Sequence, residues 1–318
     1  MKHVLIKTVA LFTLVAGFSI FYVVYKTFNK YTINILYKLN LKYIIMALGI
    51  AFLYQTFDVL RLMTLSKALN VRYSIFYGYL ISFINTFGAT VTPLHIGGEI
   101  ASVYMLKRKG AHLHKVMSIV TMKTMSGLSF FVLALPITVF YLYQKPTLGF
   151  EVLKIFLISF GIGLLTYIGL RIFFKSSILS PKRKLSVKYT LSRYIVTLKI
   201  FLRIKKSSVF LAIFYSSMLY ISFLFIAPVL IRAFGKNVDI PSSMLRQLEL
   251  LYGIYMSPTP GGAGVGEIGG LEVFKPYLSY YELGLFVILW RFVSQYFSAF
   301  IGWVLIQIVL LKEHEKKT

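Results

Sequence analysis

Apolar residues dominate the chain in long runs that are separated by short polar stretches. Six of these runs are long enough, at about 20 residues, to cross the hydrocarbon core of a bilayer as α-helices. They cover approximately residues 4–25, 43–66, 116–143, 152–174, 208–234 and 281–311. The pattern therefore predicts an all-α integral membrane protein with six transmembrane helices. The first run is too long for the core of a signal peptide and has no cleavage site, so we expect it to be an uncleaved span.

Two further apolar segments, 73–107 and 241–275, are interrupted by proline and glycine. The first contains TPLHIGGEI starting at Thr92, and the second contains TPGGAGVGEI starting at Thr259. The interruptions leave arms that are too short to span a bilayer, such as residues 94–106. We therefore expect each segment to form a re-entrant helical hairpin, in which the backbone turns back within the membrane.

The two halves of the chain align with each other. The Thr-Pro pairs match at an offset of 167 residues, and after one extra residue the offset becomes 168. The residues matched in this way include Thr92 with Thr259, Glu99 with Glu267, and Lys123 with Arg291. Each half then consists of two spans, a hairpin and a last span. This predicts an inverted-topology repeat, residues 1–143 and 152–311, within a single membrane domain covering 1–318.

Charge predicts how these elements are oriented. The chain has 35 basic and 10 acidic residues, a net charge of +25, and the loop 175–207 holds ten basic residues without an acid. Placing both termini in the cytoplasm, with the hairpins entering from opposite faces, collects most basic residues on the inside of the cell (inner) membrane. Residues 187–202 in this loop have the pattern of a basic amphipathic helix. It would serve orientation and anchoring, or alternatively recruit anionic lipid.

Composition narrows the function further. The chain is 58% hydrophobic with a mean hydropathy of +0.75, so its basic excess indicates a membrane surface and no nucleic acid partner. It has no cysteine, and its five histidines form no metal-binding pattern. We therefore expect no metal, no cofactor and no disulfide. No ATP-binding motif is present.

The candidate chemistry lies in four ionisable residues of the apolar segments. Glu99 and Glu267 lie in the first helical turn after each glycine run. Their expected basic partners follow 24 residues later, Lys123 for Glu99 and Arg291 for Glu267. An unpaired charge in a membrane is costly, so we expect these four residues to form one ionic cluster. The cluster would bind substrate, or it would be a structural clasp.

Further residues belong to this candidate translocation site. We include Glu272, which could line the same cavity, and the residues that break the helices: Thr92, Pro93, Gly97, Gly98, Thr259, Pro260, Gly261, Gly262 and Gly264. Asp58 and Arg61 lie three residues apart in the second span. We expect them to pair locally, with Arg61 extending toward the cytoplasmic face.

The motifs also carry a resemblance. Pro93-x-x-x-Gly97-Gly98-Glu99 and Pro258-Thr259-Pro260-Gly261-Gly262-Ala263-Gly264-x-x-Glu267, with the basic residue of the last span, resemble the lysylphosphatidylglycerol synthase transmembrane-domain family. This is the flippase-like membrane module of bacterial multiple peptide resistance factors. The resemblance implies a protein that translocates or handles a polar lipid. The two-module members also have a soluble aminoacyltransferase domain. We expect this protein to be a stand-alone member without that domain, so synthesis of lysyl-lipid is not expected.

The function expected from the sequence is therefore a lipid flippase or transporter and not an enzyme. Its partners would be membrane lipids with an anionic or otherwise polar headgroup, and a homo-oligomer or a lipid-synthesising partner enzyme stays open. Two alternatives remain. The protein could be a non-transporting partner of a membrane synthase or glycosyltransferase, or a membrane-embedded lipid-modifying enzyme.

Overall fold

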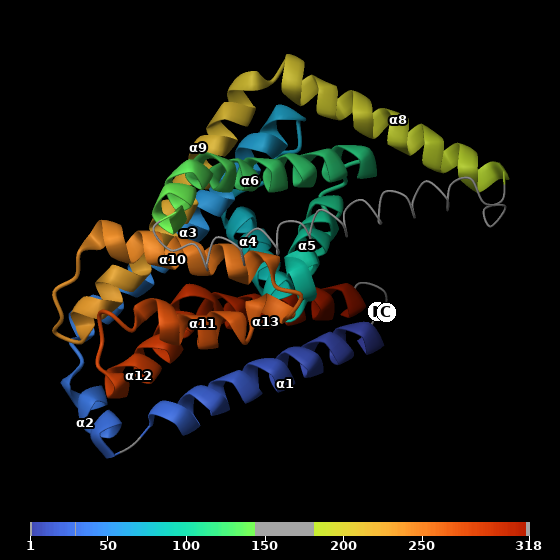
Figure 1. The fold of residues 1–318 in the computed structure, drawn as a ribbon. Helices are drawn as coiled ribbons and strands as arrows, with labels where there is room; N and C mark the ends of the chain where they lie inside the picture. Colours follow the sequence, from blue (N-terminus) through green and yellow to red (C-terminus); the bar gives the residue numbers. More distant parts are fainter. Residues whose placement is uncertain (1, 29, 144–180, 316–318) are drawn as a thin grey trace.

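The computed structural model describes residues 2–28, 30–143 and 181–315 (Figure 1). The regular structure in these ranges is entirely helical. Four helical stretches are long and apolar enough to cross a membrane, and each matches a predicted span: Leu41–Ala68, Leu113–Phe140, Lys206–Ala233 and Tyr280–Lys312. The predicted span 152–174 lies outside the described residues. The total of six crossings therefore stays a prediction.

The first predicted span lies within α1 (Lys2–Thr27), which is followed by the short α2 (Lys30–Lys38). α1 runs along the lower edge of the view in Figure 1 and packs against α12 (Tyr280–Arg291) near the other end of the sequence. The Tyr280 hydroxyl donates a hydrogen bond to the Lys26 carbonyl at this contact. The two ends of the described chain are thus joined in one bundle.

The centre of the bundle is the pair α3 (Leu41–Ala68) and α9 (Lys206–Ala233), which share the most extensive interface in the described part of the chain. α3 begins at Asn40, whose side chain accepts a hydrogen bond from the Lys42 amide at 3.1 Å. Small residues on α3, such as Ala47 and Ala51, are buried. Small side chains let membrane helices approach closely, which explains this tight central pair.

The two interrupted segments each form a helix, a 3₁₀ turn and a second helix. The first broken segment comprises α4 (Ile75–Val91), η1 (Pro93–His95) and α5 (Ile96–Lys107). The second broken segment comprises α10 (Ile240–Met256), η2 (Pro260–Gly262) and α11 (Val265–Phe274). The two arms of each segment pack against each other, and η1 contacts η2.

The last helices of the two halves differ in their winding. α6 (Leu113–Tyr143) is α-helical throughout, although it contains Pro136. The corresponding stretch of the second half comprises α12, the π-helical segment η3 (Phe292–Tyr296) and α13 (Phe297–Glu315). α13 lies so close to α4 that a Cβ atom at Gly302 would clash with the Phe83 carbonyl. The last span of the second half therefore packs on the first broken segment.

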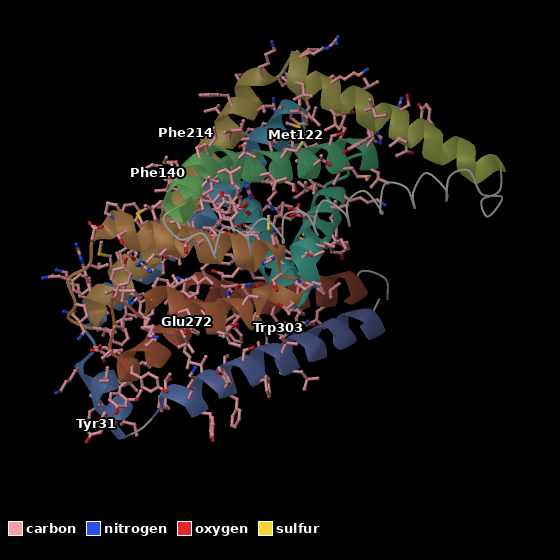
Figure 2. All side chains as sticks on the ribbon, in the orientation of Figure 1. Tyr31, Met122, Phe140, Phe214, Glu272 and Trp303 are labelled. Atoms are coloured by element: carbon pink, nitrogen blue, oxygen red, sulfur yellow. The ribbon has the colours of Figure 1, made fainter. Side chains whose placement is uncertain are left out.

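The outside of the bundle is apolar. Phe140 on α6 is 72% exposed, and Phe214 on α9 and Trp303 on α13 are also exposed (Figure 2). Large exposed aromatic side chains on several long apolar helices indicate a lipid-facing surface. The structure and the composition together identify a membrane protein.

The helix expected in the loop 175–207 is present as α8 (Pro181–Arg203), which leaves the top of the bundle in Figure 1. It packs against the beginning of α6, where Ser118 Oγ donates to the Tyr194 carbonyl at 3.3 Å. Its position at a membrane interface stays a prediction.

Candidate functional site

In the first Thr-Pro motif, a threonine side chain forms hydrogen bonds with the backbone on both sides of the helix interruption. Thr92 Oγ1 donates to the Gly88 carbonyl at 2.8 Å and accepts from the Gly97 amide at 2.7 Å. A Cβ atom at Gly97 would lie 2.5 Å from Gly88 O, and one at Gly98 would lie 2.8 Å from Asn85 O. The glycines are therefore needed for the close packing of α4 and α5, and Thr92 partners backbone groups that the break leaves free.

The second motif is closed by related bonds. Thr259 Oγ1 donates to the Ala263 carbonyl at 2.7 Å, and the Gly264 amide donates to Glu267 Oε2 at 2.7 Å. Glu267 thus caps the first turn of α11, where a carboxylate is favoured by the helix dipole.

The two motifs adopt the same unusual backbone. Leu94 and His95, which follow Pro93, have φ values of 52° and 59°. Gly261 and Gly262, which follow Pro260, have φ values of 60° and 67°. This left-handed conformation is ordinary for glycine and costly for other residues. The first motif therefore carries backbone strain that the second avoids.

The motifs also touch each other. The Gly261 amide lies 3.5 Å from the Thr92 carbonyl, and Gln295 Nε2 donates to Thr90 Oγ1 at 3.1 Å. A Cβ atom at Gly261 would lie only 2.7 Å from Thr90 O. Segments that are 167 residues apart in the sequence are thus in direct contact.

The predicted pairing of Glu267 with Arg291 is confirmed. Arg291 Nε donates to Glu267 Oε1 at 2.8 Å, and both residues are essentially inaccessible, with exposures of 1% and 0%. Three more acceptors surround the guanidinium: Gln295 Oε1 at 2.7 Å, Gly261 O at 3.0 Å and Tyr296 Oη at 3.3 Å. The Tyr296 hydroxyl also donates to Glu267. This pair is therefore fully satisfied within the protein.

The predicted pairing of Lys123 with Glu99 is wrong. Lys123 Nζ instead donates to Asn85 Oδ1 at 3.0 Å and lies 3.8 Å from Asp58 Oδ1. Asp58 is buried on α3 and also accepts from Ser82 Oγ at 2.7 Å. A buried carboxylate attracts any cation within reach, so Asp58 draws Lys123 toward α3.

Arg61 also departs from the prediction. It pairs with Asp58 as expected, but it is buried and does not extend toward an aqueous face. Its Nη1 donates to Ser216 Oγ on α9 at 3.3 Å. Asp58 and its two cations therefore form a charged cluster inside the bundle, and the predicted single cluster of four residues is wrong: the two halves carry separate ionic groups.

A cavity of about 490 Å³ lies between these two groups. Its charged lining consists of Asp58, Arg61, Glu99, Lys123 and Arg291. Its polar and aromatic lining includes Asn85, His95, Ser294, Gln295, Tyr54, Tyr220 and Tyr255. Of the predicted site residues, Glu99, Lys123 and Arg291 line the cavity. Glu267 is covered and Glu272 on α11 is exposed, so neither lines it (Figure 2). The nine predicted residues that break the helices do not line it either: Thr92, Pro93, Gly97, Gly98, Thr259, Pro260, Gly261, Gly262 and Gly264.

Four side chains in the cavity wall have buried polar atoms without a hydrogen-bond partner among the described residues. They are Arg61 Nε, His95 Nδ1, Glu99 Oε2 and Ser294 Oγ. Buried polar groups are nearly always partnered, so these atoms indicate a polar occupant or water. Within the described ranges, no group of three or more His, Asp or Glu side chains is arranged to hold a metal ion.

The fold and the cavity define a helical membrane protein with a charged internal site, and the comparisons with known proteins narrow this class. The model of the lysylphosphatidylglycerol synthase transmembrane region matches residues 6–302, and the chain belongs to this family. It is also 25% identical over 272 residues to a UPF0104 membrane protein of Archaeoglobus fulgidus. That match covers 80% of this chain and 82% of the relative. The family links the protein to lipid-related functions of membranes.

Sequence reasoning did not include several cavity residues in the site. Asp58 gave a signal, because an acid within a span is rare, but the neighbouring Arg61 offered a local partner. No sequence signal indicates Asn85 and Gln295, because an uncharged amide in an apolar helix does not indicate which residues it will face.

Proposed function

We propose that the protein moves a polar lipid headgroup between the two leaflets of the cell membrane. The observation that carries this proposal is the charged cavity beside the contact between the two Thr-Pro motifs. Five acidic or basic side chains of Asp, Glu, Lys and Arg around one internal space would be costly for a purely structural protein. Headgroups are polar while their acyl chains are apolar, so a lipid could place its headgroup in this cavity and keep its chains in the bilayer.

In this proposal, the broken segments re-enter the membrane from opposite faces as the hairpins of an inverted repeat. The packed arms of each segment and the direct contact of their turns support this arrangement. Polar backbone at membrane depth survives only where protein or a polar cavity covers it. Both termini would then be cytoplasmic, as the distribution of basic residues predicts.

Two side chains are suited to handle the headgroup. The contact of Lys123 with Asp58, at 3.8 Å, is longer than a hydrogen-bonded ion pair, so Lys123 could exchange it for a phosphate oxygen. Glu99 Oε2 has no hydrogen-bond partner within the described ranges and could accept a hydrogen bond from a headgroup hydroxyl or ammonium. The step would break no covalent bond, so we propose transport without catalysis or a cofactor.

The test is lipid translocation in proteoliposomes, followed with an acyl-labelled fluorescent phosphatidylglycerol and extraction by albumin. Glu99→Gln should slow translocation about 10-fold or more, because a charge-assisted hydrogen bond contributes about 1.5–3 kcal/mol. Glu272→Gln makes the same chemical change at an exposed site outside the cavity and should leave the rate unchanged. Lys123→Gln should behave as Glu99→Gln does.

Equal rates for Glu99→Gln, Lys123→Gln and the wild-type protein, all correctly folded, would exclude this cavity as the path. Wild-type vesicles that translocate no faster than protein-free vesicles would favour the non-transporting partner.

A further inference from the structure

A second pocket, of about 430 Å³, lies apart from the cavity described above. It is formed where three elements meet: the residues that follow the end of α3, the first turn of α6 and the middle of α8. Its polar lining consists of Asn70, His114, Lys115, Ser192, Arg193 and Thr197. No residue lines both pockets.

The walls of this pocket are held in place by specific contacts. Tyr194 on α8 bonds α6 twice, because its carbonyl accepts from Ser118 Oγ and its hydroxyl lies 3.0 Å from Thr121 Oγ1. Lys115 Nζ donates to the Leu69 carbonyl at 3.3 Å. The Arg193 guanidinium lies over the Tyr189 ring at 4.7 Å. Both cations are thus oriented before any ligand arrives.

Among the described residues that form the pocket, no acidic group balances its positive charge. None of the lining residues is acidic, and neither α6 nor α8 contains an acidic residue. Lys115 and Arg193 therefore face a common space into which the described residues bring no carboxylate. An anion in this space would interact with both cations.

The position of the pocket at the ends of two candidate membrane spans indicates which kind of anion it would bind. Two candidate membrane spans, Leu41–Ala68 and Leu113–Phe140, end or begin at its wall. The ends of spans lie where lipid phosphates lie. The pocket also has an apolar side that includes Val196, which is 54% exposed. Acyl chains could cover this side, whereas inorganic phosphate could not.

We propose that this pocket binds the phosphate-containing headgroup of an anionic membrane phospholipid as a resident lipid, separate from the lipid that the protein handles. The site would join α8 to the ends of α3 and α6. Its binding of lipid does not depend on transport through the cavity.

The test is native mass spectrometry of the purified protein, released from detergent after incubation with phosphatidylglycerol or phosphatidylcholine. The wild-type protein should retain phosphatidylglycerol in preference to phosphatidylcholine. The double variant Lys115→Gln/Arg193→Gln should bind phosphatidylglycerol roughly 10- to 30-fold more weakly, because each basic residue near the surface contributes about 1 kcal/mol.

The matched control is Lys199→Gln/Arg203→Gln, which removes the same two charge types from exposed positions of α8 outside the pocket. This variant should retain the lipid. Equal losses in the two double variants would overturn the proposal, since they would show diffuse attraction to a basic helix. The charge-conserving variant Lys115→Arg/Arg193→Lys checks folding and should keep most of the binding. Displacement of the lipid by millimolar inorganic phosphate alone would also overturn it, by assigning the pocket to free phosphate.

Discussion

The two halves of the molecule use matching residues in different ways. In the second half, Glu267 and Arg291 bond each other and are covered by further partners. In the first half, Lys123 contacts Asp58 and Asn85, and Glu99 has a buried oxygen in the cavity wall without a partner in the described part of the chain. The second copy is thus closed, whereas the first copy leaves polar groups available. A duplicated motif can therefore be fully paired in one copy and keep unpaired polar groups in the other.

The largest effect on stability is expected when the Glu267–Arg291 pair of the second half is broken. Arg291→Ala should lower the free energy of unfolding by about 3–5 kcal/mol, because it leaves Glu267 charged and buried without its partner. Lys123→Ala is the matched change in the first half. It should cost less, about 1–3 kcal/mol, since Asp58 keeps Arg61 and Ser82. Reversible unfolding in mixed detergent measures both. Equal costs would contradict the distinction between the halves.

A smaller effect is expected at the contact between the motifs. Gly261→Ala should destabilise the protein by roughly 1–3 kcal/mol, because the new Cβ atom would meet Thr90 O and the residue has a positive φ. Gly49→Ala on α3 places a methyl group where nothing lies within 4 Å and should not destabilise. The same unfolding measurement applies, and a harmless Gly261→Ala would show that the motifs need not touch.

The smallest effect has the opposite sign. Leu94→Gly should stabilise the protein by about 0.5–1 kcal/mol, because glycine removes the strain of a left-handed leucine at a cost in chain entropy that is smaller than the strain. Leu94 is 43% exposed and lines the cavity, so only part of its side chain is removed from packed surroundings. Ile96→Gly is the control, because Ile96 has ordinary helical backbone angles. This variant should lower the free energy of unfolding by about 1 kcal/mol. Destabilisation by both variants would mean that the turn carries no strain.

Much of this architecture could be predicted from the sequence, because apolar length and proline–glycine breaks act locally. The span limits of α3, α6 and α9 and the breaks near Pro93 and Pro260 follow from such signals. The Glu267–Arg291 pair could be predicted from the free-energy cost of an unpaired charge in a membrane, because pairing two opposite charges in apolar sequence lowers that cost. The partner of Lys123 could not be predicted, because it depends on which helix lies beside α6.

The same limit applies to Gln295, which links the halves through Thr90. An amide side chain is uncharged, so the sequence does not indicate what it contacts. The direction of the Gln295 side chain depends on the π-helical winding of residues 292–296. Period-3.6 reasoning assigns that residue to a different face of the helix.

The π-helical segment has a mechanical consequence. A wide turn interrupts the regular hydrogen-bond ladder, so a helix is more compliant in bending there than on either side. The last span is fastened to the first half by Gln295 within this compliant stretch, and to its own half by Arg291 just before it. A displacement of α4 would therefore change the angle between α12 and α13, while the Glu267–Arg291 ion pair keeps its position.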